Sequence, residues 1–298
     1  MLGKRWNLIK SLHYLKHQID MRIYDNAYEL MSETGRNVWE MGIENRPKTY
    51  QNKNIEGNPD FITKELIAES YCLTSLPDPK WLFVYTKTRD WADAEFIERV
   101  SGKEINPGKA WELNKGMWEE FLVDNPFKNC PVSHPMSGIE KIFDYTYACR
   151  MSNKVACHAY SGKTYLEAII QLLKDDNDTR KAVLSIFDAD KDLHRLDGWA
   201  RIPCSMYYQF LIRPNGKGEK VCNLIYNQRS SSFCGHFGDD VYLAWKLMEY
   251  VAGAVGVKPG YLYHQIGSLH CYQHDWYLLK TSIEDIMEDP NIVSSTPK

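Results

Sequence analysis

Helix-like and strand-like segments alternate through the second half of the chain, and this order constrains the fold more than any other sequence feature. Apolar residues recur at helical spacing over residues 163–173 and 240–255. A Pro-Asn-Gly-Lys-Gly run at 214–218 predicts a hairpin. Segments rich in β-branched and aromatic residues, typical of strands, occupy 182–187, 206–212, 221–226 and 261–266. This alternation predicts an α/β or α+β enzyme.

The first half of the sequence is less patterned. Residues 1–60 are polar and helical in character, and residues 92–101 predict a short helix. The chain has 44% hydrophobic and 25% charged residues, which is ordinary for a globular protein. That composition excludes a disordered chain, a collagen and a coiled coil.

The charge balance argues against a general nucleic-acid binder. Lys and Arg number 36 and Asp and Glu 39, a net charge of −3, whereas neutralising phosphates requires an excess of cations. The apolar runs are far shorter than a membrane span, and residues 1–20 lack the apolar core of a signal peptide. We therefore expect no nucleic-acid partner, no membrane association and a cytoplasmic location.

The eight cysteines form no Cys-x-x-Cys pair, so we expect no zinc ribbon and no other metal site. Most of them lie within apolar segments, which favours buried free thiols in a reducing cytosol. A single nucleophilic cysteine remains compatible with this pattern.

Two motifs carry a cation pair and a cysteine. The Asp-Thr-Arg-Lys run at 178–181 suits a phosphate, because Arg offers a planar fork and Lys a point charge. Its alternative is a solvated helix end. The Pro-Cys-Ser run at 203–205 enters a strand, where a thiol near cations can become a thiolate nucleophile. Its alternative is a core thiol.

Two further motifs carry groups that bind anions and hydroxyls. In the Asn-Gln-Arg-Ser run at 227–230, an Arg near a Cys would lower the thiol pKa and bind an anion, unless it is only an exposed strand end. In the Gly-Ser-Leu-His-Cys-Tyr run at 267–272, the His and the Tyr point the same way on a strand and could hold a sugar hydroxyl. Their alternative is a buried Tyr and a satisfied core His.

In this order the motifs resemble the thymidylate synthase superfamily, which has Asp-x-Arg-Arg, Pro-Cys, Gln-Arg-Ser and His-x-Tyr. The run at 95–102, Glu-Phe-Ile-Glu-Arg-Val-Ser-Gly, is similar to the segment that opens with the family's catalytic glutamate. A Tyr at 145 or 147 with Arg150 is similar to the family's Tyr-Gly-x-x-Trp-Arg stretch. The likeness is strong over 163–280, thinner over 90–150 and nearly absent in the first 60 residues.

The resemblance implies a fold and an assembly. We expect a single α/β domain over residues 1–298, with a large mixed, mostly antiparallel sheet and flanking helices, and with residues 1–60 as a divergent helical extension. A homodimer with shared active sites is implied, in which the cation pair comes from the other subunit. The implied substrate is a pyrimidine nucleoside monophosphate, and the implied cofactor is 5,10-methylenetetrahydrofolate.

The resemblance also implies a role for each matched residue. Cys204 is the expected nucleophile toward C6 of the pyrimidine, and Glu95 the expected base and water organiser. The other expected contacts are Arg229, Ser230, Arg180, Lys181 and Arg46 for the phosphate; His270 and Tyr272 for the sugar; Asp240 and Gln228 for the base; and Trp118, Phe121 and Ser232 for the folate.

Three departures from the family's pattern bear on the substrate. Ser205 replaces a usual His, Ser232 replaces the Asp that holds the pterin, and Asp240 replaces an Asn. An Asn amide satisfies both N3–H and O4 of uracil, whereas a carboxylate accepts from the amino group of cytosine and repels O4. Asp240 is therefore similar to the residue of dCMP and CMP hydroxymethylases, although Asp239 is adjacent and a one-residue gap would exchange the two.

The sequence thus favours a deoxycytidylate 5-hydroxymethyltransferase, an enzyme class that serves bacteriophages modifying their DNA. Three alternatives stay open. One is a thymidylate synthase or a dUMP hydroxymethylase that tolerates Asp240, and another is a CMP hydroxymethylase. The third is a relative that only binds nucleotides, against which the retention of Cys204, Arg229 and Glu95 argues.

Overall fold

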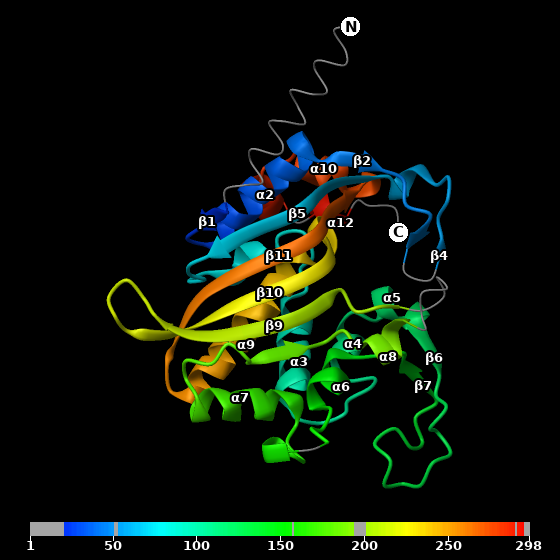
Figure 1. Ribbon diagram of the computed structural model, residues 1–298. Coiled ribbons are helices and arrows are strands. Elements are labelled where there is room, and N and C mark those ends of the chain that lie inside the picture. Colours follow the sequence, from blue (N-terminus) through cyan, green and yellow to red (C-terminus); the bar gives the residue numbers. More distant parts are fainter. Residues whose placement is uncertain (1–20, 51–52, 157, 194–200, 290, 295–298) are drawn as a thin grey trace, which may run out of the picture.

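The computed structural model describes residues 21–50, 53–156, 158–193, 201–289 and 291–294. Its main element is a seven-stranded sheet in the order β1-β5-β11-β10-β9-β8, with β2 also paired to β5 (Figure 1). The strands are β1 (Arg22–Tyr24), β2 (Ile43–Asn45), β5 (Thr63–Leu73), β8 (Val183–Ser185), β9 (Ser205–Pro214), β10 (Lys220–Ser232) and β11 (Lys258–Tyr272). This mixed sheet with flanking helices confirms the expected fold class.

The sheet is mostly antiparallel, as the sequence predicted. β5 pairs antiparallel with β2 and β11, and β9 pairs antiparallel with β8 and β10. The pairs β1–β5 and β10–β11 are parallel. The predicted hairpin joins β9 to β10 and extends beyond the rest of the sheet in Figure 1. The parallel β10–β11 pair is joined by a helix that crosses the sheet, as parallel neighbours require.

Four longer helices flank the sheet: α2 (Ala27–Met41), α3 (Arg89–Val100), α7 (Tyr165–Asp175) and α9 (Gly238–Val255). The helix α7 begins with a capping box, in which Thr164 and Glu167 satisfy each other's backbone N–H groups. The helix α9 ends at Gly256, whose φ of 79° lies in the left-handed region that glycine adopts without strain. These caps define the ends of the two helices that the spacing of apolar residues predicted.

The remaining elements are short. The minor strands are β3 (Thr49–Tyr50), β4 (Lys53–Asn54), β6 (Leu122–Asp124) and β7 (Lys141–Phe143). The short helices are α4 (Ala110–Leu113), α5 (Lys115–Trp118), α6 (Tyr147–Ser152), α8 (Ala189–Asp192), α10 (Trp276–Leu279), α11 (Ile283–Glu288) and α12 (Asn291–Ser294). No helix in these described ranges combines the length and the apolar character that crossing a bilayer demands.

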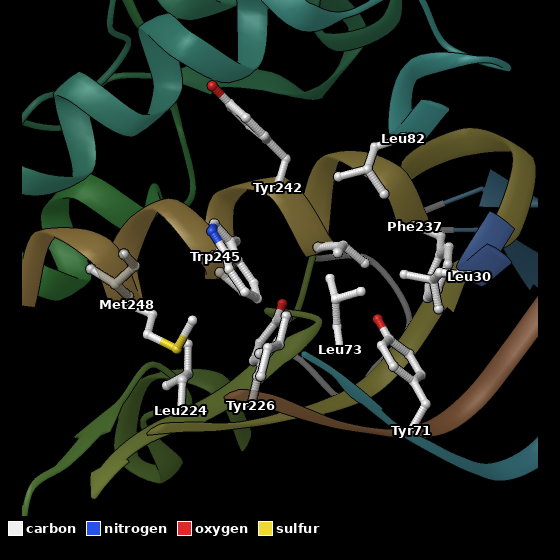
Figure 2. Packing of buried hydrophobic residues seen from close by; sticks show 14 of the residues in the cluster. Leu30, Tyr71, Leu73, Leu82, Leu224, Tyr226, Phe237, Tyr242, Trp245 and Met248 are labelled. Atoms are coloured by element: carbon white, nitrogen blue, oxygen red, sulfur yellow. The ribbon is translucent and has the colours of Figure 1, made fainter. Parts of the chain in front are cut away.

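The hydrophobic core lies between the sheet and α9. In Figure 2, Trp245 and Met248 of α9 point toward Leu224 and Tyr226 of β10, while Tyr242 points to the opposite side. All five side chains are buried. Burial of apolar surface stabilises a fold by about 25 cal/mol for each Å² that is removed from water. The core therefore fixes α9, and with it the first turn that carries Asp240.

The structure differs from the sequence expectation over residues 21–60. Only α2 in this stretch is an α-helix, whereas residues 22–24 and 43–45 are strands of the main sheet. Both strands pair with β5. Three residues are too few to show a period of two in the sequence, so strands this short form because β5 offers a backbone to pair with. Residues 1–20, part of the predicted helical extension, lie outside the described residues.

Candidate active site

A cavity of about 640 Å³ lies where the strand ends of the sheet meet α3 and α9. Side chains from β5, β10, β11, α3, α9 and the loop before β9 line it. The structure brings most of the sequence-predicted site residues to this one cavity: Glu95, Trp118, Cys204, Arg229, Ser230, Ser232, Asp240, His270 and Tyr272. Residues up to 177 positions apart in the sequence therefore share one site.

Cys204 sits at the entrance to β9 and is held by the neighbouring strand. The backbone N–H of Arg229 donates to the carbonyl of Cys204 at 2.9 Å. The Arg229 side chain donates from Nε to the carbonyl of Pro203 at 3.0 Å and from Nη2 to that of Ile202 at 2.8 Å. A shift in the β9–β10 register between Asn227 and Gln228 precedes this contact. Such bulges redirect side chains at active sites.

Burial controls the reactivity of the Cys204 thiol. Desolvation raises its pKa above the usual 9.0, and the charge of Asp240 adds to that increase. The guanidinium groups of Arg229 and Arg201 lower the pKa but do not outweigh burial. The protein without substrate therefore holds a neutral thiol at neutral pH, and the two arginines supply the positive field that a thiolate would need.

Asp240 faces the cavity from the first turn of α9. Its Oδ2 accepts hydrogen bonds from Gln228 Nε2 at 2.8 Å and from Ser231 Oγ at 3.0 Å. Desolvation raises the pKa of this carboxyl, against the opposing hydrogen bonds and the charges of His236 and Arg99. Asp239 instead accepts a hydrogen bond from Thr88 and does not line the cavity. Of the two adjacent aspartates, Asp240 is the one in reach of a ligand.

Two carboxylates from α3 line the same cavity. Glu95 accepts a hydrogen bond from Arg99 Nε at 2.8 Å, and the Arg99 guanidinium stacks over the ring of Tyr147. Glu98, one turn further along α3, accepts from the backbone N–H of Ala110 at 2.9 Å. Burial raises the pKa of Glu98. An ion pair of this kind fixes Glu95 in one orientation.

His270 and Tyr272 alternate along β11 and reach the cavity together, as their spacing predicted. Their ring centroids lie 5.0 Å apart. The neighbouring strand places Ser232 directly beside His270. Burial lowers the pKa of His270 to about 4, so its imidazole is neutral at physiological pH and can donate or accept a hydrogen bond. Burial also raises the pKa of Tyr272, which keeps its hydroxyl protonated.

An aromatic wall closes one side of the cavity. Trp118 stacks on His236 with centroids 5.4 Å apart, and Trp91 lies 6.3 Å from Trp118 in a stacked arrangement. Trp118 Nε1 is buried and has no hydrogen-bond partner among the described residues. A flat heteroaromatic ligand with a hydrogen-bond acceptor would satisfy that N–H and stack on these rings. The wall therefore fits a pterin.

Several predicted site residues do not line the cavity. Arg180 and Lys181 are exposed just before β8, and Arg46 is exposed between the lining residues Asn45 and Pro47. Phe121 is buried behind Trp118. Gln228 is buried and touches the site through Asp240.

The structure adds residues that the sequence motifs did not indicate: Trp91, Glu98, Arg201, Ser231 and His236. The Arg201 guanidinium lies among aromatic rings, 4.9 Å from the centroid of Tyr145 and 5.3 Å from that of Trp118. Arg201 lies three residues before Cys204 in the sequence, and this proximity could have indicated that it belongs to the site. His236 precedes Asp240 by four residues, the spacing of one helical turn. This spacing could have indicated that the two side chains share a face.

Comparison with known proteins decides the family. The family model described as "Thymidylate synthase" matches residues 103–296. The chain belongs to the thymidylate synthase family. Members of this family take their one-carbon unit from 5,10-methylenetetrahydrofolate, the cofactor that the sequence implied and that the aromatic wall fits.

Individual relatives are similar over part of their length. A putative thymidylate synthase of Methanosarcina mazei is 32% identical over 145 residues, which cover 48% of this chain and 60% of the relative. A deoxyuridylate hydroxymethyltransferase of Pseudomonas phage M6 is 28% identical over 58% of this chain and 52% of the relative. That of Bacillus phage SP01 is 31% identical over 61% and 43%. The chain thus spans about 60% of the archaeal relatives that it matches.

Proposed function

We propose that this protein transfers a one-carbon unit to C5 of a pyrimidine nucleoside monophosphate and releases the 5-hydroxymethyl product, with dCMP as the preferred substrate. One observation carries the proposal: the Asp240 carboxylate lines the same cavity as the Cys204 thiol. The thiol supplies the nucleophile of the family, and the carboxylate supplies the selectivity for the base.

Cys204 acts on the substrate ring. Its thiolate adds to C6, which makes C5 nucleophilic, and the arginines beside it stabilise the thiolate as it forms. Bound 5,10-methylenetetrahydrofolate supplies a one-carbon unit at the oxidation level of formaldehyde. Glu95, held by Arg99, is the proposed organiser of water beside the ring. Trp118 and Ser232 line the part of the cavity where the folate would lie.

The phosphate site combines residues of two subunits in this proposal. Arg229 uses Nε and one Nη2 hydrogen for backbone carbonyls, which leaves both Nη1 hydrogens and one on Nη2 for a phosphate. Ser230 lines the cavity beside it. Arg180 and Lys181 are exposed outside their own subunit's cavity, which suits donation across a homodimer interface. His270 and Tyr272 hold the sugar hydroxyl.

Asp240 selects the base. Cytosine offers an amino group that donates to the carboxylate, and a carboxylate also favours a proton on N3. Uracil would place O4 against the negative charge, a contact that costs binding energy. Gln228 and Ser231 both donate to Oδ2 and so hold the carboxylate in place.

A dUMP hydroxymethylase is the second candidate. Both phage relatives described above are named deoxyuridylate hydroxymethyltransferases. Burial raises the pKa of Asp240, and a protonated carboxyl would donate to O4 of uracil instead of repelling it. The ribonucleotide CMP is a third substrate that the same base contact would accept.

Product mass tests the proposal. The protein is incubated with 5,10-methylenetetrahydrofolate and with dCMP, CMP or dUMP in separate reactions. We expect a hydroxymethyl product from dCMP, and we expect Asp240→Asn to shift the preference toward dUMP by at least about tenfold. Methyl product from dUMP with oxidised folate would instead identify a thymidylate synthase. No product from any nucleotide, and no covalent adduct at Cys204, would favour a protein that only binds nucleotides.

A further inference from the structure

His236 lines the cavity between a buried carboxylate and an indole N–H that lacks a partner. The His236 side chain is 28% exposed. Asp239 Oδ2 is buried and faces His236 Nδ1 at 3.5 Å. Trp118 Nε1, on the indole that stacks on His236, is buried without a hydrogen-bond partner among the described residues. Buried polar atoms are seldom left unsatisfied, so the Trp118 N–H beside His236 suits a water molecule or a polar ligand atom.

Asp239 orients the imidazole. His236 Nδ1 lies 3.5 Å from Asp239 Oδ2, and the other side of that carboxylate accepts a hydrogen bond from Thr88. Asp239 is 1% exposed, so the packing of α9 fixes its position. With Nδ1 directed at the carboxylate, Nε2 is the ring nitrogen left for chemistry, as in other carboxylate–histidine pairs.

The surroundings of His236 suit proton transfer. Trp118 and Trp91 cover the ring, with centroids 5.4 and 6.4 Å from that of His236. The charged groups that face it are Asp239, Asp240 and Arg201. Burial alone lowers the pKa of His236, but the two aspartates raise it above 6.5. The two aspartates therefore favour the proton that the ring would take up.

We propose that His236, oriented by Asp239, is the base that activates the water which captures the transferred carbon; this rests on the proposed function. After tetrahydrofolate has left, the ring carries a methylene group at C5 and the Cys204 sulfur at C6. Water oxygen bonds to the methylene carbon while Nε2 takes the water proton. The electron pair of the exocyclic bond forms C5=C6, and the Cys204 thiolate leaves. No oxidant or reductant is needed, and C5 keeps a hydroxymethyl group.

The reverse of this step offers a test that needs no folate. The protein is incubated with 5-hydroxymethyl-dCMP or 5-hydroxymethyl-dUMP in ¹⁸O-labelled water. Addition of Cys204 and loss of hydroxide regenerate the methylene, and recapture of water then places ¹⁸O in the product. We expect exchange in the unsubstituted protein and a decrease of about 100-fold or more in His236→Gln. His134→Gln, whose ring stacks on Phe127 away from the cavity, is the matched control.

Two further readouts separate this inference from the proposed function. Exchange of the C5 hydrogen of dCMP or dUMP with deuterated water reports the Cys204 adduct, and we expect His236→Gln to retain it. Loss of both exchanges in the unsubstituted protein would defeat the proposed function. Hydrogen exchange without ¹⁸O exchange, or full ¹⁸O exchange in His236→Gln, would overturn the role of His236 alone.

The positioning role of Asp239 is tested by the pH profile. Because His236 must be neutral to accept a proton, hydroxymethyl formation falls as pH decreases through its pKa. Asp239→Asn removes a charge that raises this pKa, so the acid limb should move to lower pH. An unchanged limb would contradict the pairing.

Discussion

His264 Nε2 lies 2.8 Å from Gln228 Oε1, in the interior of the sheet. Burial lowers the pKa of His264 to about 3, so its ring is neutral and carries one N–H. Gln228 Nε2 donates to Asp240, which leaves Oε1 as the acceptor toward His264. His264 therefore donates from Nε2, and its Nδ1 accepts from the Tyr71 hydroxyl at 2.7 Å. One chain of hydrogen bonds thus runs from Tyr71 to the Asp240 carboxylate that lines the cavity.

Tyr71→Phe should loosen this chain. The substitution leaves Nδ1 of the buried His264 without a donor, which costs about 1–2 kcal/mol of folding free energy. The ring can then adopt the other tautomer, and Gln228 loses the bond that orients it toward Asp240. We expect nucleotide affinity to fall several-fold, measured by calorimetry, together with a lower urea midpoint. Tyr28→Phe, which removes an exposed hydroxyl bond to Glu284, should change neither.

The reactivity of Cys204 should depend steeply on pH. Because burial raises its pKa above 9.0, alkylation by iodoacetamide should be slow at pH 7 and should accelerate as pH rises toward that pKa. Arg229 lowers the pKa of Cys204 more than Arg201 does. Arg229→Gln removes this effect, so the pH at which alkylation accelerates should move still higher. Intact mass gives the rate, with Cys204→Ser as the background for other thiols. Rapid alkylation near pH 6 would contradict this electrostatic description.

Mixed dimers test the proposal that the active site is shared between two subunits. If Arg180 acts across the interface, neither Arg180→Ala nor Cys204→Ser homodimers have a complete site. A heterodimer of the two has one complete site, so refolding them together at equal amounts should restore about a quarter of the original activity. Cys204→Ser with Cys204→Ala should restore none. Failure of the first pair to gain activity would place Arg180 outside the site.

Residues with a local signal were predictable from the sequence. The hairpin turn and the amphipathic patterns placed β9, α7 and α9 close to their observed bounds and placed the start of β10 correctly. The predicted segment 221–226 stops short, because β10 continues to Ser232. The last residues of β10 are polar and line the cavity instead of packing into the core. They therefore lack the apolar residues by which a strand is predicted from the sequence. The predicted segment 261–266 also stops short of the end of β11 at Tyr272, where Ser268, His270 and Tyr272 line the cavity while Leu269 and Cys271 are buried in the core.

Contacts between distant segments were not predictable in this way. Tyr71 and His264 lie 193 positions apart and meet only because β5 and β11 pair, with His264 directly opposite Tyr71. No local spacing records that pairing. His236 was missed because a single histidine beside a strand end resembles a core residue until Asp239 and Trp118 are seen around it.

Two glycines of α9 should respond in opposite directions to alanine. A Cβ on Gly238 would lie 1.7 Å from the carbonyl oxygen of Leu82, a backbone atom that cannot rotate away. Gly238→Ala must therefore separate α9 from the 3-10 helix Pro79–Phe83, at a cost of about 3 kcal/mol. A Cβ on Gly253 meets nothing within 4 Å, so Gly253→Ala should add about 0.5–1 kcal/mol by favouring the helix.

Urea unfolding of both variants measures this difference. Because Gly238 directly precedes Asp239 and Asp240, its displacement should also disturb the cavity, and we expect Gly238→Ala to lose nucleotide affinity as well as stability. Gly253→Ala lies at the far end of the same helix and should bind nucleotide normally. Equal urea midpoints for the two variants would mean that α9 does not pack against Leu82 as closely as the structure places it. Contacts other than this packing would then have to hold Asp240 in position.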